Sequence, residues 1–227
     1  MPERIVHIHI PKTAGTALRS AVAEANNGEY RVFPHYDEIK FVNIAAEDYD
    51  FYSGHIGYHT AAALNGNIIT VLRNPIDRFV SVYFFWRELF AKGVENSRKT
   101  ILSNKYSLDE FSSIHDDSLL FEEFFNRATW QLAYGSSLQH RDELHSAGKT
   151  EDEIYKMALV NLRSFSVVGI QEQMQQFAAA LYQIFAIELR LSAINVTKSR
   201  VCIDDIPMQT RQKSIIGFIW IRNSTTT

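Results

Sequence analysis

The chain has 227 residues, of which 46% are apolar and 22% are charged, so it is long enough to bury a sizeable core. Its 23 Lys and Arg residues against 26 Asp and Glu residues give a formal net charge of −3. This balance excludes the broad basic field of a general nucleic-acid binder, so any anion site must be local. We expect one domain over residues 1–227 and no nucleic acid as partner.

Cysteine content and apolar patterning bear on location. The single cysteine, Cys202, cannot form an intramolecular disulfide, and residues 1–11 lack the basic start and apolar run of a signal peptide. We therefore expect a cytoplasmic protein. The apolar run at residues 214–221 is far shorter than the roughly 20 residues that span a membrane. It could instead add a strand or form an association surface for an oligomer.

The first predicted elements are a strand and a helix. Residues 4–10, RIVHIHI, form a β-branched run that Pro11 ends, which indicates a buried strand. Residues 14–26 then show helical apolar spacing through Leu18, Val22 and Ala25. The result is a strand–loop–helix unit.

A second unit of the same kind follows. Residues 67–72, NIITVL, predict a strand, and a short loop leads to a largely apolar helix at residues 76–90, with Pro75 in its first turn. Further strands are predicted at 50–53 and 166–170. Strands alternating with helices predict an α/β fold, a P-loop-like three-layer sandwich with a mainly parallel central sheet flanked by helices.

The remaining segments are less regular. Residues 94–118 are polar and weakly periodic, which predicts a surface excursion with at most short helices. Apolar residues recurring every three or four positions predict helices at 119–134, 151–163 and 171–185. The tail at 201–227 shows no clear amphipathic helix and is atypical.

The strongest chemical signal is HIPKTAGTA, residues 9–17, which joins the first strand to the first helix. Backbone N–H groups at a helix start attract anions, Lys12 adds a full charge, and Thr13 and Thr16 add hydroxyl donors. The loop is not a Walker A motif, since its lysine precedes Gly15. An ordinary strand-to-helix turn with a capping threonine is the alternative interpretation.

The second unit offers Arg73 at a strand end and Ser81 two turns into the following helix. Ligands of open parallel sheets bind at the carboxyl ends of the strands, so both loops would face one crevice. Two anion sites in one crevice suit a ligand with two separated phosphates. Taken alone, Arg73 would more often be a surface or structural ion pair.

These motifs, in this order, resemble a known family. The loop IPKTAGT, then SGH at 53–55, then LRNPIDRFVSVY from residue 72 are similar to the PAPS-dependent sulfotransferases, most of all to the heparan sulfate 2-O-sulfotransferase branch. The likeness covers residues 4–90 and resumes at 167–200, with VVGIQEQ and NVTKSR.

The resemblance implies roles for matching residues. The first loop would hold the 5′-phosphosulfate of the donor PAPS, through Lys12, Thr13, Ala14, Gly15, Thr16 and Ala17. Lys12 would also stabilise charge on the leaving oxygen of the product PAP. Arg73 and Ser81 would bind the 3′-phosphate, and Lys198 and Arg200 would close over the nucleotide.

The resemblance also assigns the general base to His55. A hydroxyl is a poor nucleophile, and an imidazole of pKa near about 6.5 can take its proton at neutral pH. The heparan enzyme has a second histidine two residues earlier, where this chain has Ser53. His7 and His9 are candidates for core or surface roles, His9 with a place beside the donor loop. No cluster has metal-ligand spacing, so we expect no metal.

The acceptor is an unspecified hydroxyl. Kinship with a glycan-modifying branch favours a carbohydrate over a protein tyrosine or a small lipid, by analogy only. Two other functions stay open: a P-loop nucleotide kinase or hydrolase, and a non-catalytic nucleotide-binding protein.

Overall fold

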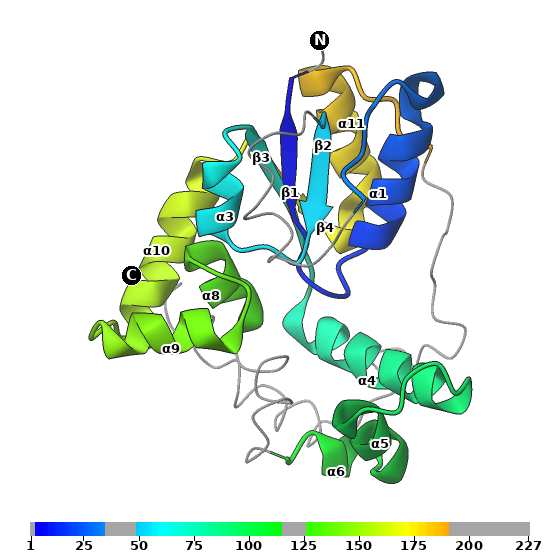
Figure 1. Ribbon diagram of the computed structural model, residues 1–227, viewed down its shortest axis with the longest axis vertical. Coiled ribbons are helices and arrows are strands. Elements are labelled where there is room, and N and C mark those ends of the chain that lie inside the picture. Colours follow the sequence, from blue (N-terminus) through cyan, green and yellow to red (C-terminus); the bar gives the residue numbers. More distant parts are fainter. Residues whose placement is uncertain (1–2, 35–48, 115–125, 191–227) are drawn as a thin grey trace. The chain divides into compact units, whose positions relative to one another are not determined.

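The computed structural model describes residues 3–34, 49–114 and 126–190 (Figure 1). They divide into two compact units. The sheet unit comprises the described residues up to Arg73 and from Ala128, and the helical unit comprises those from Asn74 to Arg127. The tail at 201–227 and residues 115–118 lie outside the described residues.

The sheet unit is built on four parallel strands. These are β1 (Ile5–Ile8), β2 (Phe51–Gly54), β3 (Asn67–Leu72) and β4 (Val167–Ile170), in the spatial order β2-β1-β3-β4. The register pairs His7 with Ser53 on one side of β1 and with Ile69 on the other. The strands predicted at 4–10, 50–53, 67–72 and 166–170 are confirmed. The β-branched residues of β1 and β3 are typical of parallel strands buried on both faces.

Helices cover both faces of this sheet (Figure 1). One face carries α1 (Gly15–Glu24) and α11 (Met174–Phe185), and the other carries α3 (Tyr58–Ala63), α8 (Arg127–Ala133) and α10 (Glu151–Arg163). The predicted α/β class, with helices flanking a central parallel sheet, is confirmed. The predicted helix at 151–163 agrees with α10 at both ends.

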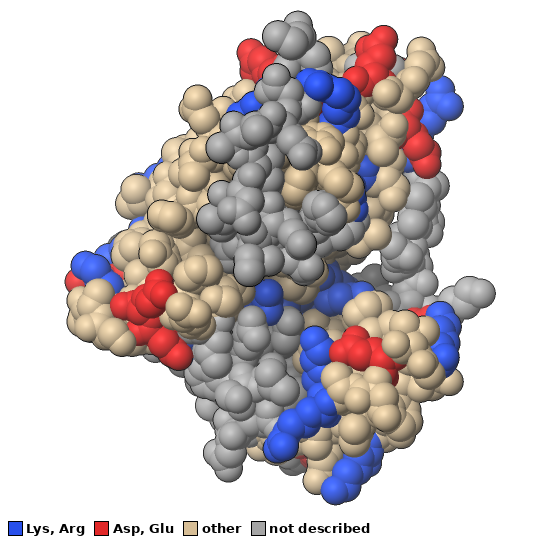
Figure 2. Space-filling model, in the orientation of Figure 1, with Lys and Arg blue, Asp and Glu red and all other residues tan. Residues whose placement is uncertain are grey.

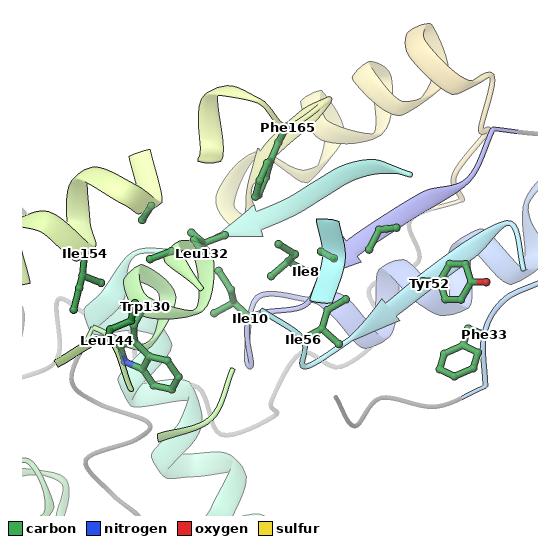
Figure 3. Close-up of a cluster of buried hydrophobic side chains, with 14 residues drawn as sticks. Ile8, Ile10, Phe33, Tyr52, Ile56, Trp130, Leu132, Leu144, Ile154 and Phe165 are labelled. Atoms are coloured by element: carbon green, nitrogen blue, oxygen red, sulfur yellow. The ribbon is translucent and has the colours of Figure 1, made fainter. Parts of the chain in front are cut away.

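Alternation along β1 divides the core into two layers. Ile5 packs on the α1 side with Leu18 and Val22. Val6 and Ile8 face the opposite layer, a cluster that also holds Ile10, Ile56, Trp130 and Ile154 (Figure 3). Strand ends and helices therefore share one packed core on each face of the sheet.

Some helices differ from the prediction. Of the helix predicted at 119–134, α8 begins at Arg127, and residues 119–125 lie outside the described residues. Two helices were not predicted: α3, and α9 (Leu138–Ser146). The first is too short to show a period, and the second carries few apolar residues.

The helical unit is centred on α4 (Pro75–Ala91), with α5 (Arg98–Lys105) and α6 (Leu108–Phe111). Asn74 caps α4: its side-chain oxygen accepts the N–H of Ile76 at 3.0 Å, and Pro75 takes the first position. The segment predicted as an excursion does contain short helices. Phe111 is nevertheless fully buried, against Phe79 and Trp86 of α4.

No helix within the described ranges is both long and apolar enough to cross a membrane.

A matched pair of substitutions tests the core. Ile69 of β3 is fully buried, whereas Ile184 of α11 is 55% exposed. Ile69→Ala is expected to lower the free energy of unfolding by about 2–5 kcal/mol, because it removes buried methyl groups and leaves a cavity. Ile184→Ala should change it by about 0.5 kcal/mol or less. Urea denaturation of both variants measures the difference, and equal losses would contradict this arrangement of the core.

Candidate active site at the carboxyl edge of the sheet

The candidate site lies where β1 and β3 end side by side. From β1 the chain passes through α1 to β2 on one side, while β4 lies on the other side of β3. Such a reversal of strand order opens a crevice outside the carboxyl ends of the strands, the usual ligand site of an open α/β sheet. The loops after β1 and β3, with Lys12 and Arg73, emerge at this point.

The loop after β1 has an unusual backbone. Lys12 has φ of 67°, and Ala14, the N-cap of α1, has φ of 68°, so both are left-handed residues with a Cβ atom. Each such conformation costs about 1–2 kcal/mol. Alternating left-handed residues turn successive N–H groups inward, which makes an anion-binding concavity.

Two side chains stabilise this loop. The hydroxyl of Thr13 donates to the carbonyl of Ile10 at 2.7 Å, and Thr13 is 1% exposed. Nη1 of Arg73 donates to the carbonyl of Lys12 at 3.0 Å. Arg73, a predicted phosphate ligand, therefore also stabilises the predicted phosphate loop. The hydroxyl proton of Thr13 is used in a hydrogen bond within that loop.

The first turn of α1 has the features of an anion site. Its N-cap supplies no side-chain hydrogen bond, and the turn carries no acidic residue. Gly15 is buried, Thr16 is exposed and Ala17 is partly exposed. Lys12, also partly exposed, adds a positive charge beside N–H groups that α1 itself leaves without helical partners. The residues present fit a bound phosphosulfate.

The predicted base lies at the same edge. His55 directly follows β2 and is partly exposed. Its ring centroid is 4.8 Å from that of His9, which itself precedes the phosphate loop. The structure thus brings His55 close to the start of the loop that carries Lys12.

Ser53 faces the interior instead. It is fully buried, and its hydroxyl lies 2.8 Å from Nδ1 of His7 on the neighbouring strand. Burial, and to a lesser extent the charge of His55, lowers the pKa of His7 from 6.5 to about 3. His7 is therefore a neutral core histidine, and position 53 is enclosed with it rather than open to an acceptor.

Three predicted ligands lie outside the described part of the sheet unit. Ser81 is a partly exposed residue of α4, which belongs to the helical unit. Lys198 and Arg200 lie outside the described residues. Within the sheet unit, the predicted site residues that the structure describes are the loop at 9–17, Arg73 and His55.

Sequence reasoning missed Gln131. This glutamine of α8 is fully buried, and its Nε2 donates to the carbonyls of His9, at 3.2 Å, and Ile56, at 2.9 Å. It links the backbone segments that follow β1 and β2. The only available signal was a polar side chain between Trp130 and Leu132 in an apolar helix, which does not reveal its partners.

Charge is distributed without one broad basic field on the face that Figure 2 draws, where acidic side chains accompany the basic ones. Among the described residues, no group of three or more His, Cys, Asp or Glu side chains is arranged to hold a metal ion.

Burial of neutral His7 predicts a pH dependence of stability. Its pKa is lower in the folded chain than in the unfolded one, so the unfolded chain binds the extra proton between about pH 6.5 and pH 3, and stability falls as pH falls. From pH 7 to pH 5 this group alone should remove about 2 kcal/mol.

The control replaces both partners, as His7→Val with Ser53→Ala, so that neither is left unpaired. Urea denaturation at pH 7 and pH 5 measures the loss in each protein. The double variant should lose less stability over this interval than the parent chain; an equal loss would contradict a neutral, buried His7.

Residues 2–212 match the model that describes the sulfotransferase family. No curated protein matches the chain. The matched region includes the whole sheet unit, with the loop after β1, Arg73 and His55. With most of its length covered by this match, the chain belongs to the sulfotransferase family.

Proposed function

We propose that this sulfotransferase moves a sulfuryl group from PAPS to a hydroxyl of an acceptor, with carbohydrate as the favoured acceptor class. One observation carries the proposal. The left-handed loop with Lys12, braced by Arg73, leads into the uncapped first turn of α1 at the carboxyl edge of the sheet. Family membership makes sulfate transfer the relevant chemistry.

The donor would bind by its two ends. Backbone N–H groups of residues 13–17, with the Thr16 hydroxyl and the Lys12 ammonium, would hold the 5′-phosphosulfate. Arg73 would bind the 3′-phosphate through its guanidinium, whose planar N–H donors suit a phosphate, while one of them donates to the Lys12 carbonyl. Ser81, Lys198 and Arg200 keep their proposed roles at the 3′-phosphate and over the nucleotide, on the resemblance alone.

The reaction would be an in-line displacement at sulfur. His55 takes the proton of the acceptor hydroxyl, and the oxygen attacks sulfur to form the new S–O bond. The S–O bond to the 5′-phosphate breaks, and its electron pair leaves on the phosphate oxygen of PAP. Lys12 and the N–H groups of α1 stabilise this charge, so they act most strongly as the bond breaks.

Two other functions make different demands. A nucleotide kinase or hydrolase would prefer ATP with magnesium, whereas this loop carries its lysine before Gly15. A non-catalytic nucleotide-binding protein would bind PAP without turning over PAPS. Nucleotide preference and turnover therefore separate the three.

The proposal predicts that His55→Ala lowers sulfuryl transfer by about 10²- to 10⁴-fold, because the attacking hydroxyl loses its base. Affinity for PAP should change by less than about 3-fold, since His55 is not a proposed nucleotide ligand. Transfer of ³⁵S from labelled PAPS to desulfated heparin, a tyrosine peptide and a simple phenol measures activity, and titration calorimetry measures PAP binding.

His59→Ala is the matched control. His59 lies four residues further along, is exposed, and has no proposed role, so this variant should keep its activity. Loss of PAP binding in His55→Ala, or unchanged turnover, would remove His55 from the role of base.

A further inference from the structure

The backbone on the N-terminal side of His55 is fixed by β1. The regular pairing of β1 and β2 ends at Ile8 and Gly54. The N–H of His9 then donates to the carbonyl of Gly54 at 2.9 Å, which extends the ladder to the residue before His55. A side chain carried by the end of a paired strand is held more precisely than one on a free loop.

The ring of His9 connects His55 with the phosphate loop. His9 is 5% exposed, and its ring centroid lies 4.8 Å from that of His55, with 43° between the ring planes. The same ring lies against Gly15: a Cβ atom added to Gly15 would come within 2.0 Å of Cδ2 of His9. The imidazole therefore occupies space at the first turn of α1 that only a glycine at position 15 leaves open.

A second, independent contact fixes the backbone on the C-terminal side of His55. Gln131 binds the carbonyls of His9 and Ile56, and Ile56 is fully buried in the core. The amide is itself completely enclosed. A buried polar side chain that ties two strand ends together restricts both. His55 is thus held on either side, at Gly54 and at Ile56.

We propose that His9 is a positioning residue, whose ring fixes the imidazole of His55 relative to the first turn of α1, while Gln131 holds the two strand ends in register. This inference rests on the proposed role of His55 as the base. His9 acts through His55 and takes no proton from the acceptor. The same ring that touches the base touches the helix start proposed to bind the donor, so base and donor are aligned by one side chain.

The test compares His9→Phe, which keeps a flat ring, with His9→Ala, which removes it. The rate at which diethyl pyrocarbonate modifies each histidine is measured at pH 7 by peptide mass spectrometry. In His9→Ala, His55 should react several-fold faster than in the parent chain, because its ring is no longer packed. His9→Phe should restore a rate close to that of the parent.

Two histidines serve as internal controls in the same digests. Exposed His59 should react equally in all the proteins, and so should His140 of α9, whose ring contacts that of Tyr134. Faster reaction of His140 would report general loosening of the fold rather than release of His55, and would overturn the inference. Equal His55 rates in the parent chain and His9→Ala would overturn it as well.

Turnover gives the functional half of the test. His9→Ala should lower kcat by about 10- to 100-fold, with the KM for PAPS and the affinity for PAP nearly unchanged, because a misplaced base slows the chemical step alone. His9→Phe should recover most of this loss. Full activity of His55→Ala would refute the proposed base; full activity of His9→Ala beside an inactive His55→Ala would refute only the positioning role.

Gln131→Leu provides a variant that does not depend on His9 accepting substitution. It has similar volume and removes both hydrogen bonds, so it should raise the reactivity of His55 and lower kcat in the same direction as His9→Ala. Gln139→Leu, at an exposed position of α9, is the control and should change neither. A Gln131→Leu protein with the parent's His55 reactivity and kcat would contradict the part assigned to this glutamine.

Discussion

A hydrogen bond from Arg73 to the carbonyl of Lys12 joins the loops that follow two neighbouring strands. The loop after β1 needs such support, because Lys12 and Ala14 both adopt left-handed conformations that residues with a Cβ atom disfavour. Without it the backbone would relax toward an ordinary turn, and the N–H groups at the start of α1 would lose their arrangement. The proposed donor site depends on this contact.

The brace gives Arg73 two tasks. One N–H donates to the Lys12 carbonyl and shapes the loop, and the guanidinium is also proposed to bind the 3′-phosphate. A lysine could not do both equally well, since its compact ammonium lacks the planar, five-donor geometry of a guanidinium. The 3′-phosphate and the 5′-phosphosulfate of the donor would then bind to two loops that are hydrogen-bonded to each other. In this way binding energy from the remote phosphate would orient the reacting group.

Local patterns predicted the sheet unit well. The four strands of the described sheet were all predicted, and Pro75 marked the first turn of α4, because such signals depend on neighbouring residues only. The pairs His7 with Ser53 and His9 with His55 could not be predicted in this way. They depend on which strands are neighbours and on the register between them, and the sequence of one strand determines neither.

The hydrogen-bond partners of Gln131 could not be predicted from the sequence either. Its hydrogen bonds reach His9, 122 residues earlier, and Ile56, 75 residues earlier. A buried glutamine is explained only once those carbonyls are located in space. By contrast, His55 could be selected from the sequence because it stands in an ordered set of motifs, and the structure adds the ring of His9 beside it. The order of motifs was thus enough to nominate His55, whereas the contacts that hold it in place emerge only from the structure.

The central claim is that the loop after β1 and Arg73 together bind a nucleotide with both 3′ and 5′ phosphates. Titration calorimetry of the parent chain and of Arg73→Ala with PAP, with 5′-AMP and ATP as competitors, tests it directly. The account predicts binding of PAP in preference to 5′-AMP and ATP, and loss of that preference in Arg73→Ala. Absence of PAP binding, or a preference for ATP with magnesium, would contradict it.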